Sequence, residues 1–154
     1  MNGAPPPAGA EAPDFEWDER GAPVRLAARC RDSGALLLFL PLACSPVCRE
    51  DARALAGAAA ALGAPRRPLV VVSVDRDAHL RRFLDEHGGA LLSPLGDPGL
   101  ELAGRYGVRR PEGFCARASF LVGRDRRVTA WEVHPIGFPR PIALLQEWIA
   151  RADG

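Results

Sequence analysis

Two short and wholly apolar segments limit the folds open to this chain. Residues 35–40 have the sequence ALLLFL, and residues 68–74 have the sequence PLVVVSV, which is rich in β-branched side chains. Runs of this length and composition are typical of strands buried on both faces. Apolar residues at helical spacing follow the first run from Cys48 onward, and a second helix is expected over about 79–87. This alternation predicts an α/β fold whose mixed central sheet is flanked by helices.

The remaining patterns fit the same fold. Alternating residues around a Gly-containing turn predict an N-terminal hairpin over 15–26. Further elements are expected in the second half of the chain: strands over 90–93, 118–122 and 128–133, and helical segments over 98–107 and 141–151. We expect one domain over 12–154, preceded by a disordered arm over 1–11 that is rich in Pro and small residues.

Composition excludes several classes of function. The formal net charge of +1 and the scattered arginines give no reason to expect nucleic acid or an anionic membrane as a partner. The longest apolar run is far below the roughly 18 residues that span a bilayer, and no export signal is recognisable. Four cysteines in such a chain favour reduced thiols and a cytoplasmic location over a disulfide framework.

The segment over 41–48, PLACSPVC, joins the first buried strand to the helix that follows it. Cys48 is therefore expected at the start of a helix. Free backbone N–H groups and the positive end of the helix dipole favour a thiolate over a thiol at this position. We predict that Cys48 is a nucleophile.

The same segment resembles the active site of peroxiredoxins, in which a Pro is followed after three residues by Thr or Ser and, two residues further on, by the peroxidatic Cys. Here these positions are Pro41, Ser45 and Cys48. The sequence APDF over 12–15 is similar to the first strand of the family, and RASFLV over 117–122 is similar to the strand that carries its second active-site arginine. The resemblance implies a thioredoxin-like fold with peroxiredoxin elaborations and a thiol-dependent peroxidase of the AhpC/TSA type, with no cofactor or metal.

The resemblance also implies roles for individual residues. Cys48 attacks the peroxide, and the Ser45 hydroxyl bonds to both peroxide and thiolate, although Ser45 also suits a plain helix N-cap. Pro41 shields the sulfur, and Arg117 stabilises the thiolate and the charge that develops on the peroxide. Asp51 stands where relatives often carry Glu or Gln, and we expect no particular role for it.

The sulfenic acid left on Cys48 must be reduced by another thiol. The bacterioferritin-comigratory branch commonly has a resolving Cys five positions later, where this chain has Arg53. The pattern resembles more closely the one-cysteine alkyl hydroperoxide reductase E branch. That branch implies reduction by thioredoxin, mycoredoxin or glutaredoxin, or a low-molecular-weight thiol, and the family implies a homodimer. Cys115 and Cys44 remain candidate resolving residues, whereas Cys30 is expected to be inert.

A second interpretation comes from another class of protein. Cys44 and Cys48 form a Cys-x-x-x-Cys pattern similar to that of copper-binding Sco-type metallochaperones, in which two thiolates and a distal His hold the metal. The same pair of cysteines would also suit a thiol-disulfide protein. The distal His of those proteins lies shortly before the strand that begins here near Arg117, where this chain has Phe114-Cys115-Ala116. His134 is the only remaining candidate ligand. The resemblance therefore favours the peroxidase.

Overall fold

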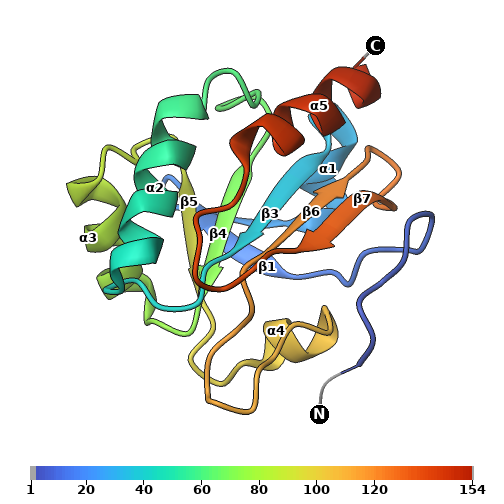
Figure 1. Ribbon diagram of the computed structural model, residues 1–154. Coiled ribbons are helices and arrows are strands. Elements are labelled where there is room, and N and C mark those ends of the chain that lie inside the picture. The colour runs from blue at the N-terminus through green and yellow to red at the C-terminus, as the bar shows by residue number, and fades with distance from the viewer. Residues whose placement is uncertain (1–2, 154) are drawn as a thin grey trace.

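A five-stranded mixed sheet forms the centre of the computed structural model, which describes residues 3–153 (Figure 1). In chain order the elements are β1 Glu16–Glu19, β2 Ala22–Arg25, α1 Leu26–Ser33, β3 Ala35–Phe39, α2 Pro46–Ala58, β4 Leu69–Ser73, α3 Asp77–Glu86, β5 Ser93–Gly96, α4 Glu101–Arg105, β6 Ala118–Val122, β7 Val128–Val133 and α5 Ile142–Asp153. The strand order is β5-β4-β3-β6-β7, and β1 and β2 form a separate hairpin. β3, β4 and β5 are mutually parallel, whereas β6 runs antiparallel to β3 and to β7.

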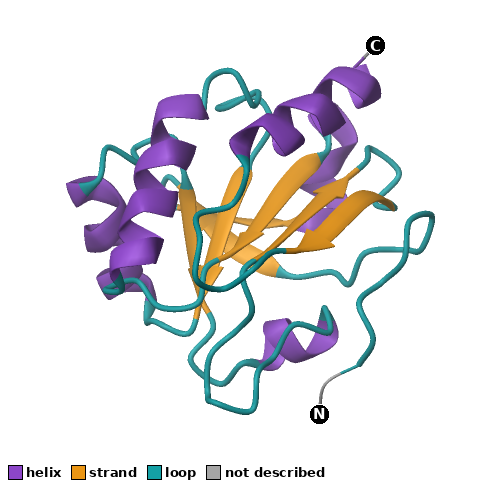
Figure 2. Cartoon of the chain, in the orientation of Figure 1, coloured by secondary structure: helices purple, strands orange, loops and turns teal. Residues whose placement is uncertain are grey.

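The sheet separates two hydrophobic layers, as Figure 2 shows by the helices on either side of the strands. All five residues of β3 are buried, and successive side chains point to opposite faces. Leu36 and Leu38 pack in the layer that contains α2, α3 and α5. Leu37 and Phe39 pack in the layer that contains α1, α4 and the hairpin. The wholly apolar sequence of β3 is thus explained by a core on both sides.

The turn between β3 and α2 places the start of a helix at the end of the central strand. The Ser45 hydroxyl accepts the Cys48 N–H at 3.1 Å, and Pro46 occupies the first turn, where its missing N–H has no cost. In open α/β sheets, ligand sites lie beyond the carboxyl ends of the strands. Cys48 lies at such a position.

The expected α/β, thioredoxin-like arrangement with an N-terminal hairpin is confirmed, but two elements differ from the sequence-based prediction. Residues 26–33 form α1, which was not predicted because no side chain caps its N-terminus and only Leu26 and Cys30 are buried. The strand expected over 90–93 is wrong in position, since β5 begins at Ser93. β5 is an edge strand, and an edge tolerates Pro94, which lacks an N–H.

The arm expected over 1–11 stays a prediction, and its first two residues lie outside the described part of the chain. Later residues of this segment contact the sheet: Gly9 N–H donates to the Val128 carbonyl at 2.8 Å, and Glu11 forms an isolated bridge with Arg127. Among the described residues, no helix is long and apolar enough to cross a membrane.

Gly34 joins α1 to β3 in a conformation that few other residues adopt. Its φ is 70°, and its N–H closes α1 on the Cys30 carbonyl at 2.7 Å. A Cβ atom at this position would lie 2.4 Å from the Val122 carbonyl oxygen. Gly34→Ala is therefore expected to lower the free energy of unfolding by about 2 kcal/mol or more, measured by urea denaturation.

Gly57 provides the matched control. It lies on the exposed side of α2, where an added Cβ meets no atom within 4 Å. Gly57→Ala is expected to raise stability by about 0.5–1 kcal/mol. Equal stability of Gly34→Ala and wild type would contradict this account of the α1–β3 junction.

Candidate active site

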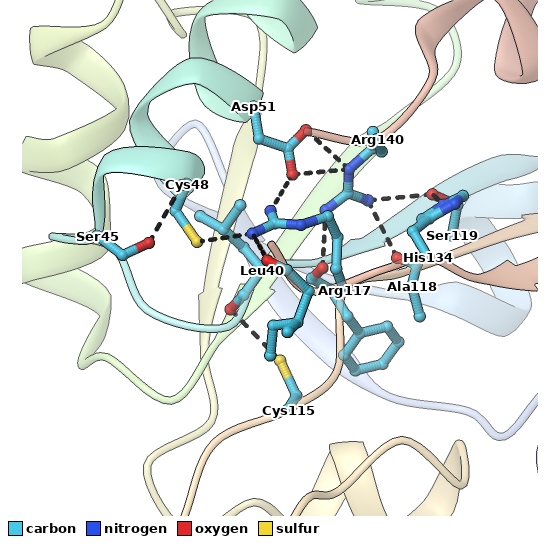
Figure 3. Close-up of polar contacts among 12 residues, drawn as sticks. Leu40, Ser45, Cys48, Asp51, Cys115, Arg117, Ala118, Ser119, His134 and Arg140 are labelled. Carbon is cyan, nitrogen blue, oxygen red and sulfur yellow. Dashed lines mark hydrogen bonds and ion pairs between the residues drawn. The ribbon is translucent and has the colours of Figure 1, made fainter. Parts of the chain in front are cut away.

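Cys48 lies in the first turn of α2 and has no exposed surface. It belongs to the apolar layer formed by α2, α3 and α5. Its sulfur nevertheless has a cationic neighbour, because Nη2 of Arg117 lies 3.4 Å from Cys48 Sγ and donates to it. Figure 3 shows the two side chains pointing toward one another. The structure thus brings together the two residues that sequence reasoning placed at the centre of the site.

Arg117 is held from the other side by a carboxylate. It precedes β6, is 1% exposed, and donates through Nη1 to Asp51, which is fully buried on α2. Its Nη2 also donates to the Ile136 carbonyl at 3.3 Å. Because Cys48 and Asp51 are three residues apart on one helix, they occupy the same side of α2. One guanidinium therefore spans both.

Arg140, between β7 and α5, completes the cluster. Its Nε lies 3.0 Å from both carboxylate oxygens of Asp51. Its Nη2 donates to the Phe39 carbonyl at 2.7 Å, and its Nη1 donates to the Ala118 carbonyl at 3.0 Å. Arg140 therefore connects the ends of β3 and β6 to the carboxylate that orients Arg117.

The charges of this cluster do not cancel. Arg117, Arg140 and Asp51 are each 2% exposed or less, so two cations face one anion in a region without solvent. Burial of an uncompensated charge is costly. Cys48 Sγ lies in contact with Arg117, so a negative charge on this sulfur would balance the second cation.

A polar pair extends the cluster away from Cys48. The Ser119 hydroxyl accepts from Arg140 Nη1 at 3.1 Å and lies 2.9 Å from His134 Nε2. His134 Nδ1 lies 3.2 Å from a carboxylate oxygen of Glu132 but makes no well-aligned hydrogen bond. Burial, followed by the charge of Arg140, lowers the pKa of His134, although Glu132 opposes this shift. A neutral His134 fits beside Arg140 without repulsion.

Two of the predicted site residues have structural roles that are visible, while their catalytic roles stay predictions. Ser45 is the N-cap of α2, and its recorded contact is with the Cys48 N–H and not with Sγ. Pro41 is buried two residues after the end of β3. Both residues shape the turn that carries Cys48.

The two candidate resolving cysteines lie in very different surroundings. Cys44 is exposed. Cys115 is 1% exposed, belongs to the layer on the other face of the sheet from Cys48, and donates its S–H to the Leu40 carbonyl at 3.3 Å. Burial raises the pKa of Cys115 to about 12. Its neutral thiol is a poor nucleophile. Burial likewise raises the pKa of Cys30.

A copper site has little support in this arrangement. Cys44 is exposed while Cys48 is buried, and Nε2 of His134 is already engaged by Ser119. Over residues 3–153, no three His, Cys, Asp or Glu side chains are grouped so that they could hold a metal ion.

Sequence reasoning missed Asp51 and Arg140. Asp51 was set aside because it differs from the residue common in relatives. Its carboxylate nevertheless forms ion pairs with Arg117 and Arg140. Arg140 carried no local signal, since it follows a Gly-Phe-Pro turn. The spacing of Asp51 three residues after Cys48 was the only available hint of a shared helix face.

A thioredoxin-like sheet with a cysteine at a helix start, in contact with a buried arginine, defines a protein of thiol redox chemistry. Comparison with protein families makes this more specific. The AhpC/TSA family model matches residues 8–131, which is most of the chain. The chain belongs to the AhpC/TSA family and is a peroxiredoxin-type, thiol-dependent peroxidase. No curated protein sequence matches it.

Solved structures support the fold. The peroxidoxin BcpB of Mycobacterium tuberculosis is 24% identical, with a TM-score of 0.78 over 94% of this chain and 96% of that one. The reduced 2-Cys peroxiredoxin of Plasmodium vivax is 22% identical, with a TM-score of 0.79 over 93% and 80% of the two chains. A mutant of peroxiredoxin 6 from Arenicola marina is 19% identical, with a TM-score of 0.80 over 94% and 72%.

Arg117→Ala is expected to slow the reaction of Cys48 with hydrogen peroxide by about 10²- to 10³-fold, because it removes a preorganised charged donor from the sulfur. The second-order rate is measured by stopped-flow Trp fluorescence. Arg105→Ala, at an exposed position on α4, is the control and should react at the wild-type rate. A wild-type rate for Arg117→Ala would show that its contact with Cys48 has no catalytic value.

His134 is expected to make stability depend on pH. Its pKa is lowered in the folded state from the ordinary value of 6.5. The unfolded chain therefore binds the proton more readily, and folding stability should fall as pH drops below about 6.5. His134→Gln, which keeps a polar group beside Ser119, should flatten this slope in urea denaturation between pH 7 and pH 5 (a window set by the His pKa). An unchanged slope would contradict the assignment.

Proposed function

We propose that the chain reduces hydrogen peroxide or organic hydroperoxides, with peroxynitrite as a further candidate substrate, through Cys48. The observation that carries the proposal is the contact between Cys48 Sγ and a buried guanidinium whose own charge is only partly balanced. The Cys48 thiolate attacks one peroxide oxygen and the O–O bond breaks, leaving a sulfenic acid on Cys48. The leaving oxygen takes up a proton and departs as water or an alcohol.

Arg117 would serve both states of this step. Its Nη2 donor is directed at the thiolate before attack, and the same guanidinium can share the charge that moves onto the leaving oxygen. Asp51 and Arg140 act as positioning residues, because they hold Arg117 through buried ion pairs. Ser45, beside Cys48 at the N-cap, offers a hydroxyl to the peroxide, and Pro41 shields the sulfur.

Substrate access requires local movement. Cys48 has no exposed surface, so a peroxide reaches Sγ only when the turn over 41–45 or the first turn of α2 shifts. This burial favours small hydroperoxides over bulky ones. The same burial protects the thiolate between reactions.

Recycling is proposed to depend on an external thiol or redoxin, such as thioredoxin, mycoredoxin, glutaredoxin or a low-molecular-weight thiol. Position 53 is an arginine, so a resolving cysteine five positions beyond Cys48 is absent. Cys115 is buried in the opposite layer with a strongly raised pKa, which argues against it as a resolving residue. This behaviour matches the one-cysteine branch of the family.

A homodimer in the cytoplasm is also proposed. β7 is an edge strand of the sheet, and three of the four exposed large apolar residues in the described part of the chain lie at its end and just beyond it: Val133, Ile136 and Phe138. Phe138 is 67% exposed. An apolar patch beside a strand edge suits a second copy of the chain.

The cytoplasmic location is supported by the cysteines. All four are free thiols, as a reducing compartment would keep them.

The decisive experiment compares two serine variants. Cys48→Ser should abolish peroxide consumption, whereas Cys30→Ser should leave it near the wild-type rate, because Cys30 lies in the layer on the other face of the sheet from Cys48 and burial raises its pKa. Stopped-flow fluorescence of Trp17, Trp131 and Trp148 follows the reaction. After one equivalent of peroxide, dimedone should trap Cys48 as its sulfenic acid. Comparable rates for Cys48→Ser and wild type would overturn the proposed role of Cys48.

A further inference from the structure

A basic cavity lies between α2 and α3, outside the cluster around Cys48. It has a volume of about 370 Å³, within the range of small-molecule sites. Its lining residues come from the turn before α2, from both helices and from the end of α3: Cys44, Arg49, Arg53, His79, Arg82, Phe83, Glu86 and His87. Figure 1 shows α2 and α3 next to each other at the edge of the molecule. Three arginines thus face a single carboxylate.

The arginines of this cavity lack partners within the described chain. Over residues 3–153, the side chains of Arg49, Arg53 and Arg82 form no ion pair or hydrogen bond. Arg49 and Arg53 are one helical turn apart on α2, so their like charges repel each other and destabilise the helix. An anion in the cavity would relieve this repulsion.

Nearby acidic residues do not neutralise the cavity, because several are engaged elsewhere. Asp51 of α2 is inside the active-site cluster. On α3, Asp85 pairs with Arg81. Asp75, just before α3, is engaged by His79 at the margin of the cavity and not by the three arginines. Guanidinium groups bind carboxylate and phosphate through paired hydrogen bonds. The cavity therefore suits a ligand that carries such groups.

Cys44 gives the cavity a free thiol that can form a covalent bond with a ligand. It is the exposed member of the four cysteines, and it lines the same space as the three arginines. A ligand held by its anionic groups at these arginines would therefore occupy the same cavity as the Cys44 thiol. The turn that carries Cys44 is also tied to the cavity, since the Ala43 N–H donates to Asp75 Oδ2 at 2.9 Å and Asp75 Oδ1 lies 3.0 Å from His79 Nδ1.

We propose that this cavity binds a small thiol compound bearing carboxylate or phosphate groups, and that Cys44 is its point of covalent attachment. The attaching form is the disulfide of that compound. The Cys44 thiolate attacks one sulfur, a Cys44–S–S–R bond forms, the original S–S bond breaks, and the departing RS⁻ takes up a proton. Cys44 is oxidised and half of the disulfide is reduced. The attached group lies beside the turn that carries Cys48.

The test uses reduced protein without peroxide, so that its outcome is independent of the proposed peroxidase cycle. Wild type is mixed with glutathione disulfide, with coenzyme A disulfide, or with the cationic disulfide cystamine. Adduct formation is timed by intact mass, and the site is found by peptide mapping. We expect an adduct on Cys44 with both anionic disulfides and none in Cys44→Ser. A faster reaction with coenzyme A disulfide than with glutathione disulfide would identify phosphate as the preferred group, and the reverse would identify carboxylate.

The role of charge is tested with two matched triple variants. Arg49→Gln/Arg53→Gln/Arg82→Gln should slow both anionic disulfides by about tenfold or more and should not slow cystamine. Arg31→Gln/Arg105→Gln/Arg124→Gln removes three exposed arginines that do not line the cavity and should stay within about twofold of wild type. Arg53→Gln alone should slow both anionic disulfides by less than the triple variant does and should not slow cystamine.

Three results would overturn the proposal. The first is equal slowing in both triple variants, which would show an effect of overall net charge. The second is an adduct that persists in Cys44→Ser. The third is a reaction with cystamine as fast as that with the anionic disulfides in wild type.

Discussion

The buried pairing of Asp51 with Arg117 and Arg140 is the interaction on which the site depends. A carboxylate and two guanidiniums cannot remain in an apolar interior unless each is matched by charge or hydrogen bonds. Asp51 is shared between the two arginines, and the carbonyls of β3 and β6 accept from Arg140. What remains unmatched is one positive charge, and it lies at the cysteine sulfur. A negative charge on that sulfur, which the proposed reduction of peroxide also requires, would balance it.

The sheet makes this arrangement possible by bringing distant segments together. Arg117 and Arg140 lie 66 and 89 residues after Asp51 in the chain. The antiparallel pairing of β3 with β6 brings the start of β6, next to Arg117, beside the end of β3, where the turn to α2 begins. The segment after β7 crosses the same end of the sheet and places Arg140 beside Asp51. Figure 3 shows the resulting row of side chains.

Local sequence patterns were sufficient to predict the elements whose structure depends on residues close together in the chain. The apolar runs identified β3 and β4, and the strand-turn-helix context identified Cys48. Arg117 was found only because its strand resembled a known family. The roles of Arg140 and of the Ser119–His134 pair were not predicted, because they arise from contacts between segments that share no local motif. Helix α1 was not predicted for a different reason. It lacks a capping side chain, and the burial of Leu26 and Cys30 against the core stabilises it.

The donors that Arg140 gives to the backbone have an evolutionary consequence. By donating to the carbonyls of Phe39 and Ala118, which are partners in the pairing of β3 with β6, Arg140 links the two strands at the end of their ladder. A substitution there removes a fastening of the sheet and an orienting charge of the site in one step. Selection for a stable chain and selection for a reactive sulfur therefore act on the same side chain.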